Sequence, residues 1–251
     1  MVDQNVIGIF SGKGGVGKTT LTVNLAAALS QLNKNAIAID TDFKMSGLGL
    51  HLGMYQFPVT IKEVLLSEKN LIDAIYIHSS GIRIVPAPLY VKDIDSSKLK
   101  EILSAPFLSE NYVLLDSPPG LERNAFDVME SCNSALIVTT PDIPAVTDAL
   151  KIVKELKEKG VPIRGVVVNM NDRRGIKIEE IQETLELPVL SVIPFDKDVK
   201  KSLFVREPLL CYNPYSPAAV SIKKLACLIS GDEYKQERLL LLKRLLKGIK
   251  K

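Results

Sequence analysis

A chain of 251 residues with 46% hydrophobic content is long enough for one sizeable α/β core and short for two, so we expect one domain. No run approaches the ~18 apolar residues of a membrane-spanning helix, and no basic segment precedes the first apolar run, which predicts a cytoplasmic protein without a signal peptide. The net charge is +3, but residues 238–251 hold six cations and no acid, which leaves −3 on residues 1–237. Because nucleic-acid binders usually display a basic face on the fold, this distribution argues against a nucleic-acid partner.

The first predicted unit is a strand, a loop, a helix and a second strand. The apolar run at 6–10 predicts a buried strand, residues 19–31 carry leucines at helical spacing, and residues 35–40 form a second short strand. Such a βαβ unit places the end of each strand at one edge of the sheet, where ligands of open α/β folds collect.

The loop between the first strand and the helix reads SGKGGVGKTT over residues 11–20 and matches the phosphate-loop spacing G-x-x-x-x-G-K-[ST]. Residues without a β-carbon let backbone N–H groups surround a triphosphate, and the following helix adds the positive end of its dipole. We expect Lys18 to contact the β and γ phosphates, Thr19 to ligate Mg²⁺ and Thr20 to contact the α phosphate. The predicted nucleotide-binding residues of this loop are Gly12, Lys13, Gly14, Gly15, Val16, Gly17, Lys18, Thr19 and Thr20.

Lys13 follows the first glycine, and the resulting G-K-G-G-V-G-K-T resembles the deviant phosphate loop of the MinD/ParA family of ATPases. The resemblance implies ATP/ADP and Mg²⁺ as cofactors and an ATP-dependent homodimer, in which Lys13 reaches the nucleotide of the other subunit. A second cation would neutralise charge that develops during phosphoryl transfer, as an arginine finger does. The alternative for Lys13 is a solvated surface lysine.

Asp116 ends the apolar run 112–116 and precedes the turn Ser117-Pro118-Pro119-Gly120. This stretch resembles the Walker B strand and the D-x-P-x-G turn of the MinD branch. The resemblance implies that Asp116 holds Mg²⁺ through a water molecule. The alternative is an aspartate that caps the next turn.

Asp40 and Asp42 follow the second predicted strand. The resemblance implies that Asp40 belongs to the metal shell with Asp116 and Thr19, and that Asp42 orients the attacking water. Lys13, Lys18 and Asp42 are therefore the predicted catalytic residues, acting by position and charge more than as strong bases. The alternative for Asp42 is a solvated residue of a switch segment.

The rest of the chain alternates between helical patterns and short apolar runs, after a Gly-rich stretch at 43–54 that suits a nucleotide-dependent switch. This alternation predicts the α/β fold of P-loop NTPases, a largely parallel twisted sheet with helices on both faces. Helices are predicted over 59–66, 71–76, 95–103, 145–159, 178–185 and 216–229. Strands are predicted over 82–86, 112–116, 135–139, 163–169 and 189–193.

The adenine pocket is predicted from two strand ends. Asn169 ends the run 163–169 and resembles the asparagine that reads adenine in the family, while Pro194 and Phe195 follow the next strand at the position of the family's adenine loop. No guanine-reading N-K-x-D stands at this point, so ATP is preferred over GTP. An asparagine at a strand end is also an ordinary turn former.

The three cysteines, Cys132, Cys211 and Cys227, are widely spaced and include no C-x-x-C pair. We interpret them as reduced thiols. Some relatives in the family carry an iron–sulfur cluster between subunits, and the ligand spacing for that cluster is missing here.

Residues 238–251 read RLLLLKRLLKGIKK, in which leucines fall on one helical face and lysines on the other. A basic amphipathic helix predicts binding to an anionic membrane surface, and the tail resembles the membrane-targeting helix of the MinD branch. Burial against the body or a coiled coil is the alternative. We therefore predict an ATPase domain over residues 1–231 and a membrane-targeting tail over residues 232–251.

Together these features predict a MinD-like, Mg²⁺-dependent ATPase at the inner face of the cell membrane. Its ATP-driven dimerisation would control reversible membrane association and position division or other polar machinery, with an unidentified activator or cargo protein. The alternatives are a ParA-like DNA-partition ATPase, a flagellar or pilus placement ATPase, and a metal-cluster carrier.

Overall fold

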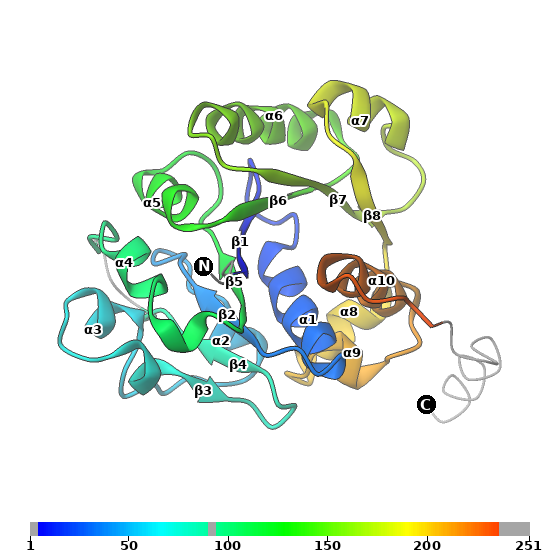
Figure 1. Cartoon of the computed structure of the whole chain (residues 1–251). Coiled ribbons are helices and arrows are strands. Elements are labelled where there is room, and N and C mark those ends of the chain that lie inside the picture. Colours follow the sequence, from blue (N-terminus) through cyan, green and yellow to red (C-terminus); the bar gives the residue numbers. More distant parts are fainter. Residues whose placement is uncertain (1–4, 90–93, 236–251) are drawn as a thin grey trace.

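The computed structural model describes residues 5–89 and 94–235, which build an eight-stranded sheet with helices on both sides (Figure 1). The strands in chain order are β1 (Asn5–Phe10), β2 (Ala36–Asp40), β3 (Tyr76–Ile77), β4 (Arg83–Val85), β5 (Tyr112–Asp116), β6 (Ser134–Thr139), β7 (Ile163–Asn171) and β8 (Val189–Pro194). Across the sheet they lie in the order β3-β4-β2-β5-β1-β6-β7-β8. All neighbours are parallel except the pair β3–β4.

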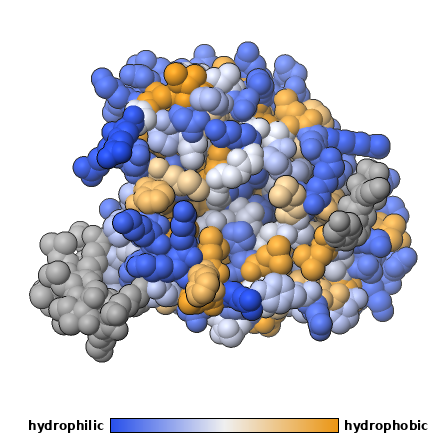
Figure 2. All heavy atoms as spheres, turned by 180° about the vertical axis from the view of Figure 1, so that it is seen from behind, coloured by the Kyte–Doolittle hydropathy of each residue, from blue (hydrophilic) through white to orange (hydrophobic). Residues whose placement is uncertain are grey.

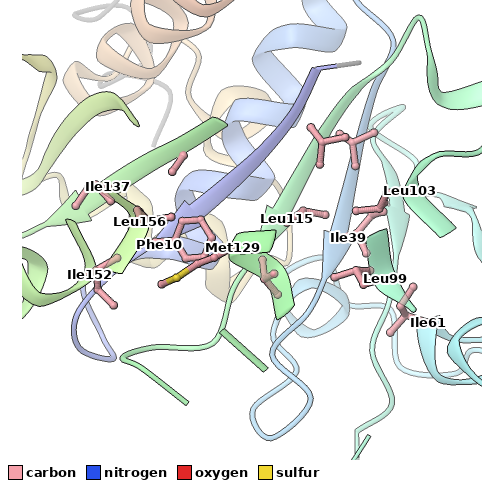
Figure 3. Packing of buried hydrophobic residues seen from close by; sticks show 14 of the residues in the cluster. Phe10, Ile39, Ile61, Leu99, Leu103, Leu115, Met129, Ile137, Ile152 and Leu156 are labelled. Carbon is pink, nitrogen blue, oxygen red and sulfur yellow. The ribbon is translucent and has the colours of Figure 1, made fainter. Parts of the chain in front are cut away.

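Two hydrophobic cores lie on the two faces of the sheet, because successive residues of a strand point to opposite faces. In β1, Val6 and Phe10 belong to one core, and Ile7 and Ile9 to the other. The first core contains residues of α3 (Ile61–Leu65), α4 (Leu99–Leu103), α5 (Arg123–Ser131), α6 (Ile143–Glu158) and α7 (Ile178–Leu185), and Figure 3 shows part of its packing. The second contains residues of α1 (Lys18–Gln31), α2 (Leu48–His51), α9 (Leu209–Tyr212) and α10 (Pro217–Ser230).

The predicted α/β class, with a mostly parallel sheet covered on both faces, is confirmed by this arrangement. The central strands are mostly apolar because a parallel sheet covered by helices buries both of its faces. Seen from behind, the surface is largely hydrophilic, with apolar residues in separate small patches (Figure 2). Among the described residues, no helix is both long and apolar enough to cross a membrane.

Three of the predicted helices in the described part of the chain are shorter than the sequence pattern indicates. The helix predicted over 59–66 is α3, Ile61–Leu65, which begins after the capping residue Thr60. The helix predicted over 95–103 begins at Leu99, because Asp95 Oδ1 accepts a hydrogen bond from the Ser97 N–H (3.1 Å) and holds a turn there. The helix predicted over 71–76 is a single 3₁₀ turn at Leu71–Ala74, and Tyr76–Ile77 pairs with β4 instead.

Four helices had no predicted counterpart: α2, α5, α8 (Lys197–Phe204) and α9. Two of them, α2 and α9, have four residues each, which is too short for a helical period to stand out. Helix α10 ends at Ser230 with Gly231 in the left-handed region (φ 73°), close to the predicted end of the ATPase domain. The amphipathic helix predicted over 238–251 lies outside the described residues, so the division at 231/232 stays a prediction.

Candidate nucleotide-binding site

The carboxyl ends of three neighbouring strands, β1, β2 and β5, meet at one edge of the sheet. The loop 11–17 leaves β1 and enters α1, while β2 and β5 end in Asp40 and Asp116, which lie opposite each other in the strand register. Strand β1 lies between β5 and β6, and the sheet extends from it in both directions, through β5 and β2 on one side and through β6 and β7 on the other. Open α/β sheets bind ligands where the strand order reverses in this way. The fold therefore gathers the predicted phosphate loop and both carboxylates at one place.

Two glycines of the loop are required by contacts within the protein. A β-carbon on Gly12 would stand 2.2 Å from the carbonyl carbon of Asp148 in α6, and one on Gly17 would stand 2.4 Å from Asn169 Nδ2. Gly17 also has φ 93°, a conformation that side chains rarely adopt. Gly14 is exposed, and a β-carbon there would meet only Pro119 Cγ at 4.0 Å.

Replacing Gly12 with alanine is expected to destabilise the fold, because the new methyl group collides with the backbone of α6. An overpacked site of this kind costs about 3 kcal/mol, and we expect the melting temperature to fall by roughly 10 °C. Thermal denaturation followed by circular dichroism measures the change. Gly14→Ala in the same loop is the control and is expected to melt within a degree or two of the unaltered chain; equal melting of the two variants would contradict the prediction.

Lys18 is buried at the start of α1, with its Nζ donating to Ser11 Oγ (2.8 Å). Burial lowers the pKa of Lys18, while the negative charges of Asp116 and Asp42 act in the opposite direction. The predicted catalytic lysine thus lies within the electrostatic influence of two of the predicted carboxylates. A fixed cation at the base of the loop is suited to neutralising phosphate charge.

Asp40 is fully buried and orders the segment that follows β2. Its Oδ2 accepts hydrogen bonds from Ser46 Oγ (3.0 Å), Gly47 N (2.9 Å) and Leu48 N (3.1 Å), and its Oδ1 accepts one from Asp42 N (3.1 Å). These contacts hold residues 43–54, which we call the switch segment, against the end of the strand. Four accepted hydrogen bonds leave the Asp40 carboxylate little capacity for a metal ion.

Asp116 is buried as deeply but has an oxygen to spare. Its Oδ1 accepts a hydrogen bond from Thr22 Oγ1 (3.3 Å), whereas its Oδ2 has no hydrogen-bond partner among the described residues. A buried carboxylate oxygen without a partner, beside the Thr19 hydroxyl, fits the hard oxygen ligands that Mg²⁺ prefers. The metal-binding prediction is therefore better supported for Asp116 than for Asp40.

The two strand-end carboxyls have raised pKa values. Burial, joined by the nearby charge of Asp116, raises the pKa of Asp40 to about 7. Burial raises the pKa of Asp116 to about 6, although the neighbouring Thr19 and Thr22 hydroxyls and the Lys18 charge oppose the shift. A bound cation would favour the charged form of both groups.

These pKa values predict that stability rises as the pH falls from about 8 to about 6.5. In this window the folded chain takes up protons on Asp40 and Asp116, while in the unfolded chain both remain ionised at their ordinary pKa of 3.8. A proton taken up fully is worth about 1.4 kcal/mol per pH unit, so we expect the melting temperature to rise by roughly 3 °C. The window ends near pH 6.5 because the lowered pKa values of His51 and His78 act in the opposite direction below it.

Calorimetry without metal or nucleotide measures this pH dependence, with Asp116→Asn as the comparison. The variant lacks one of the two titrating carboxyls and the charge that raises the pKa of Asp40, so its melting temperature should change less over the same window. A steeper slope in the variant, or a fall in stability of the unaltered chain, would be incompatible with these protonation assignments.

Asp42 lies half-buried at the start of the switch segment, where its Oδ1 accepts a hydrogen bond from Met45 N (3.0 Å). Its charge acts on both Lys18 and Asp116. Two ties connect neighbouring loops across this region: Lys44 pairs with Glu122 (2.7 Å), and Gly120 N donates to Ser11 O (3.0 Å). The three predicted aspartates and the phosphate loop thus form one connected site.

Lys13 points away from its own loop toward α6. Its Nζ lies 3.0 Å from Asp142 Oδ1, and both side chains are partly exposed, at 39% and 44%. Asp142 caps α6 by accepting a hydrogen bond from Ala145 N (3.0 Å). The sequence pattern did not single out Asp142, although an aspartate just before Ile143-Pro144 is a helix-start signal.

The predicted adenine pocket is assembled from β7, β8 and α1. Asn169, Pro194 and Phe195 line a cavity of about 100 Å³ together with Thr20 of the phosphate loop. Asn169 Nδ2 donates to Val16 O (2.8 Å), so this asparagine also fixes the phosphate loop. Its second amide hydrogen and its carbonyl oxygen are chemically suited to a base edge, and the adenine-reading role stays a prediction.

A parallel sheet, a glycine loop entering a helix, a buried lysine and strand-end carboxylates define a P-loop nucleotide-binding protein. A family model described as "ParA: NUBPL iron-transfer P-loop NTPase" matches residues 3–230, and the chain accordingly belongs to the ParA family of P-loop NTPases. The family predicted from the phosphate loop is confirmed.

Relatives of known sequence or structure match nearly the whole chain. An uncharacterised ATP-binding protein of Methanocaldococcus jannaschii is 34% identical over 236 residues, covering 92% of this chain and 89% of its own length. The cell division ATPase MinD of Pyrococcus furiosus superposes with a TM-score of 0.85 at 35% identity, covering 91% of this chain and 99% of its own. MinD of Pyrococcus horikoshii, solved with Mg-ADP, has a TM-score of 0.84 at 33% identity, covering 95% and 98%. The predicted kinship with MinD ATPases is thereby confirmed.

Proposed function

We propose that this chain is a MinD-like, Mg²⁺-dependent ATPase that dimerises on ATP and binds a membrane reversibly in the dimeric form. The observation that carries the proposal is the position of Lys13. This residue belongs to the phosphate loop, but its side chain is paired with Asp142 at the edge of the loop. A partly exposed ion pair is weak and easily exchanged, so Lys13 is available to a second nucleotide.

Within one subunit, the residues divide the work by position and charge. Thr19 and Asp116 would hold Mg²⁺, which supplies charge neutralisation and orients the phosphates when bound. Lys18 neutralises charge from the base of the loop, and Asp42 positions the water that attacks. Lys13 of the partner subunit would add a cation to the phosphates from outside.

Exposed apolar side chains near the site support a second copy as the partner. Met45 in the switch segment is 78% exposed, and Ile143, which directly follows Asp142, is 71% exposed. Single exposed apolar side chains are common on protein surfaces, so the support for a partner comes from the position of these two beside the predicted site. A face-to-face dimer would bury both of them around the two nucleotides.

Membrane binding is proposed through residues 238–251, which lie outside the described residues. One short basic helix binds a membrane marginally, but two helices held in one dimer gain from their high effective concentration. Nucleotide-dependent dimerisation therefore becomes nucleotide-dependent membrane residence at the inner face of the cell membrane. An activating or cargo protein would bind the same ATP-bound dimer.

We expect ATP with Mg²⁺ to recruit the protein to liposomes containing anionic lipid, and ADP to leave it in solution. Co-sedimentation with the Asp42→Ala variant, in which hydrolysis should be blocked, measures the ATP-bound form. Deleting residues 238–251 is expected to abolish pelleting while ADP affinity stays unchanged. Equal pelleting with ADP and ATP would refute the switch, and retained pelleting after the deletion would place the membrane site elsewhere.

A second candidate is the metal-cluster carrier, since the description of the matching family model names iron transfer. The three cysteines lie in separate elements: Cys132 follows α5, Cys211 lies in α9 and Cys227 lies in α10. Visible absorption after anaerobic reconstitution with iron and sulfide separates the two candidates, since a cluster carrier turns brown. A gel-shift titration across salt concentrations tests the DNA-partition alternative in the same way.

A further inference from the structure

His51 connects the switch segment to the phosphate loop. It is the last residue of α2, is partly buried, and makes a hydrogen bond with each of its ring nitrogens. Nδ1 lies 2.9 Å from Gly47 O in the switch segment, and Nε2 lies 3.2 Å from Thr20 Oγ1 in α1. The sequence offered no reason to place this histidine at the site.

The hydrogen-bond roles of this histidine follow from its partners. A backbone carbonyl only accepts, so Nδ1 carries the hydrogen that is donated to Gly47 O. Burial lowers the pKa of His51, which keeps the ring neutral, and the Nε2 of a neutral Nδ1–H ring is an acceptor. The Thr20 hydroxyl is therefore the donor, and its only hydrogen is directed at His51.

A bound phosphate would be a second acceptor for the same hydroxyl hydrogen. Thr20 is the predicted ligand of the α phosphate, and phosphate oxygens beside a threonine accept hydrogen bonds. Because a hydroxyl has one hydrogen, Thr20 cannot donate fully to both His51 and a phosphate. If the phosphate receives it, His51 Nε2 is left partly buried without its donor, which is unfavourable.

Gly47 is the residue of the switch segment through which His51 would affect the rest of that segment. Its N–H is held by Asp40 (2.9 Å), its carbonyl accepts from His51, and a β-carbon on it would lie 3.1 Å from Thr19 Cγ2. The residue is thus packed between the metal-site threonine, the strand-end carboxylate and the histidine. A change at His51 is transmitted directly to this point.

We propose that His51 is a positioning residue that makes phosphate binding and the α2 end of the switch segment compete for the Thr20 hydroxyl, so that a bound nucleotide loosens that end. The proposal rests on the proposed function, because it takes Thr20 to be a phosphate ligand. The competition requires neither a second copy of the chain nor a dimer. The link operates within one subunit, before any partner arrives.

Two substitutions separate the two hydrogen bonds of His51. Asparagine can keep the bond to the carbonyl four residues earlier, as Asn24 does with Thr20 O (2.8 Å), but is too short to reach Thr20 Oγ1 as well. Glutamine places its amide oxygen near the position of Nε2 and keeps an acceptor for Thr20. His51→Asn therefore removes the competition, and His51→Gln retains it.

Calorimetric titration with Mg-ADP measures the effect. His51→Asn is expected to bind ADP roughly three- to tenfold tighter than the unaltered chain, the factor that one net hydrogen bond gives. His51→Gln should bind with near-normal affinity. Equal or weaker binding by a folded His51→Asn variant would overturn the proposal.

Nitrogen-15 NMR gives a second readout that does not depend on a variant at position 51. The chain has two histidines, so a His78→Gln variant leaves the His51 ring signals alone. Without nucleotide, Nε2 should show the shift of an unprotonated nitrogen that accepts a hydrogen bond. Adding ADP should move this signal, and Thr20→Val, which deletes the hydroxyl, should move it in the same direction without nucleotide.

The outcomes distinguish this inference from the proposed function. If the unaltered chain binds no ADP, the nucleotide function and this inference both fail. If ADP binds while the His51 signals stay where they were, only the inference fails, and His51 is then a residue that merely closes α2 through Gly47.

Discussion

Replacing Asp42 with alanine is expected to lower the rate of ATP hydrolysis by roughly 10²- to 10⁴-fold while ATP affinity stays within a few-fold. The carboxylate is half-buried at the start of the switch segment and acts electrostatically on Lys18 and Asp116, which places it beside the phosphate loop. Among the described residues, the hydrogen bond of its side chain joins Oδ1 to Met45 N in the switch segment and not to the phosphate loop. Single-turnover hydrolysis and equilibrium binding measure the two effects separately.

Asp73→Ala serves as the control for this variant. Asp73 is an exposed aspartate in the short helix Leu71–Ala74, where it accepts from Asn70 N (3.1 Å). It should hydrolyse ATP at the normal rate. Hydrolysis by Asp42→Ala at more than a tenth of the normal rate would remove Asp42 from the mechanism and shift the role of orienting water to another group.

Replacing Lys13 with alanine is expected to abolish the ATP-dependent dimer and to lower hydrolysis by about 10³-fold, the contribution typical of a cation supplied from outside the loop. Binding of ADP to the monomer should persist, because Lys18 and the backbone of the loop remain. Light scattering coupled to size-exclusion chromatography, with ATP and Mg²⁺ present, reports the dimer. A dimer of normal affinity would show that Lys13 is a surface lysine.

Asp142→Asn tests the same lysine from the other side. Asparagine caps a helix as well as aspartate does, so α6 should stay intact. The change removes the charge that holds Lys13 at 3.0 Å, and a partly exposed pair is worth at most about 1 kcal/mol. The variant is therefore expected to dimerise at an ATP concentration up to about fivefold lower, whereas weaker dimerisation would mean that the pair supports the dimer.

The sequence was most informative where one local pattern fixes both structure and chemistry. The loop 11–20 predicts phosphate binding because such a loop needs glycines at a set spacing next to a lysine and a threonine. Strand β5 and helix α7 have the predicted bounds, because an unbroken apolar run or a clean helical stripe leaves few alternatives. Short elements such as α2 and β3 were missed because two to four residues carry no period.

Within the site, residue type predicted proximity better than it predicted roles. Asp40, Asp42 and Asp116 meet beside the phosphate loop because parallel strands end at the same edge of the sheet. Their different tasks depend on hydrogen bonds that no spacing records: Asp40 accepts four, while Asp116 keeps one oxygen without a partner in the described part of the chain.

The amino-acid sequence by itself determined that this protein has a phosphate loop with an additional lysine, set in an α/β sheet, because those features depend on neighbours along the chain. Only the tertiary structure decided that Lys13 is paired with Asp142 and that His51 holds Thr20. These partners are 129 and 31 residues apart. Contacts over such separations depend on how strands and helices pack, and the spacing of residue types along the chain does not predict that packing.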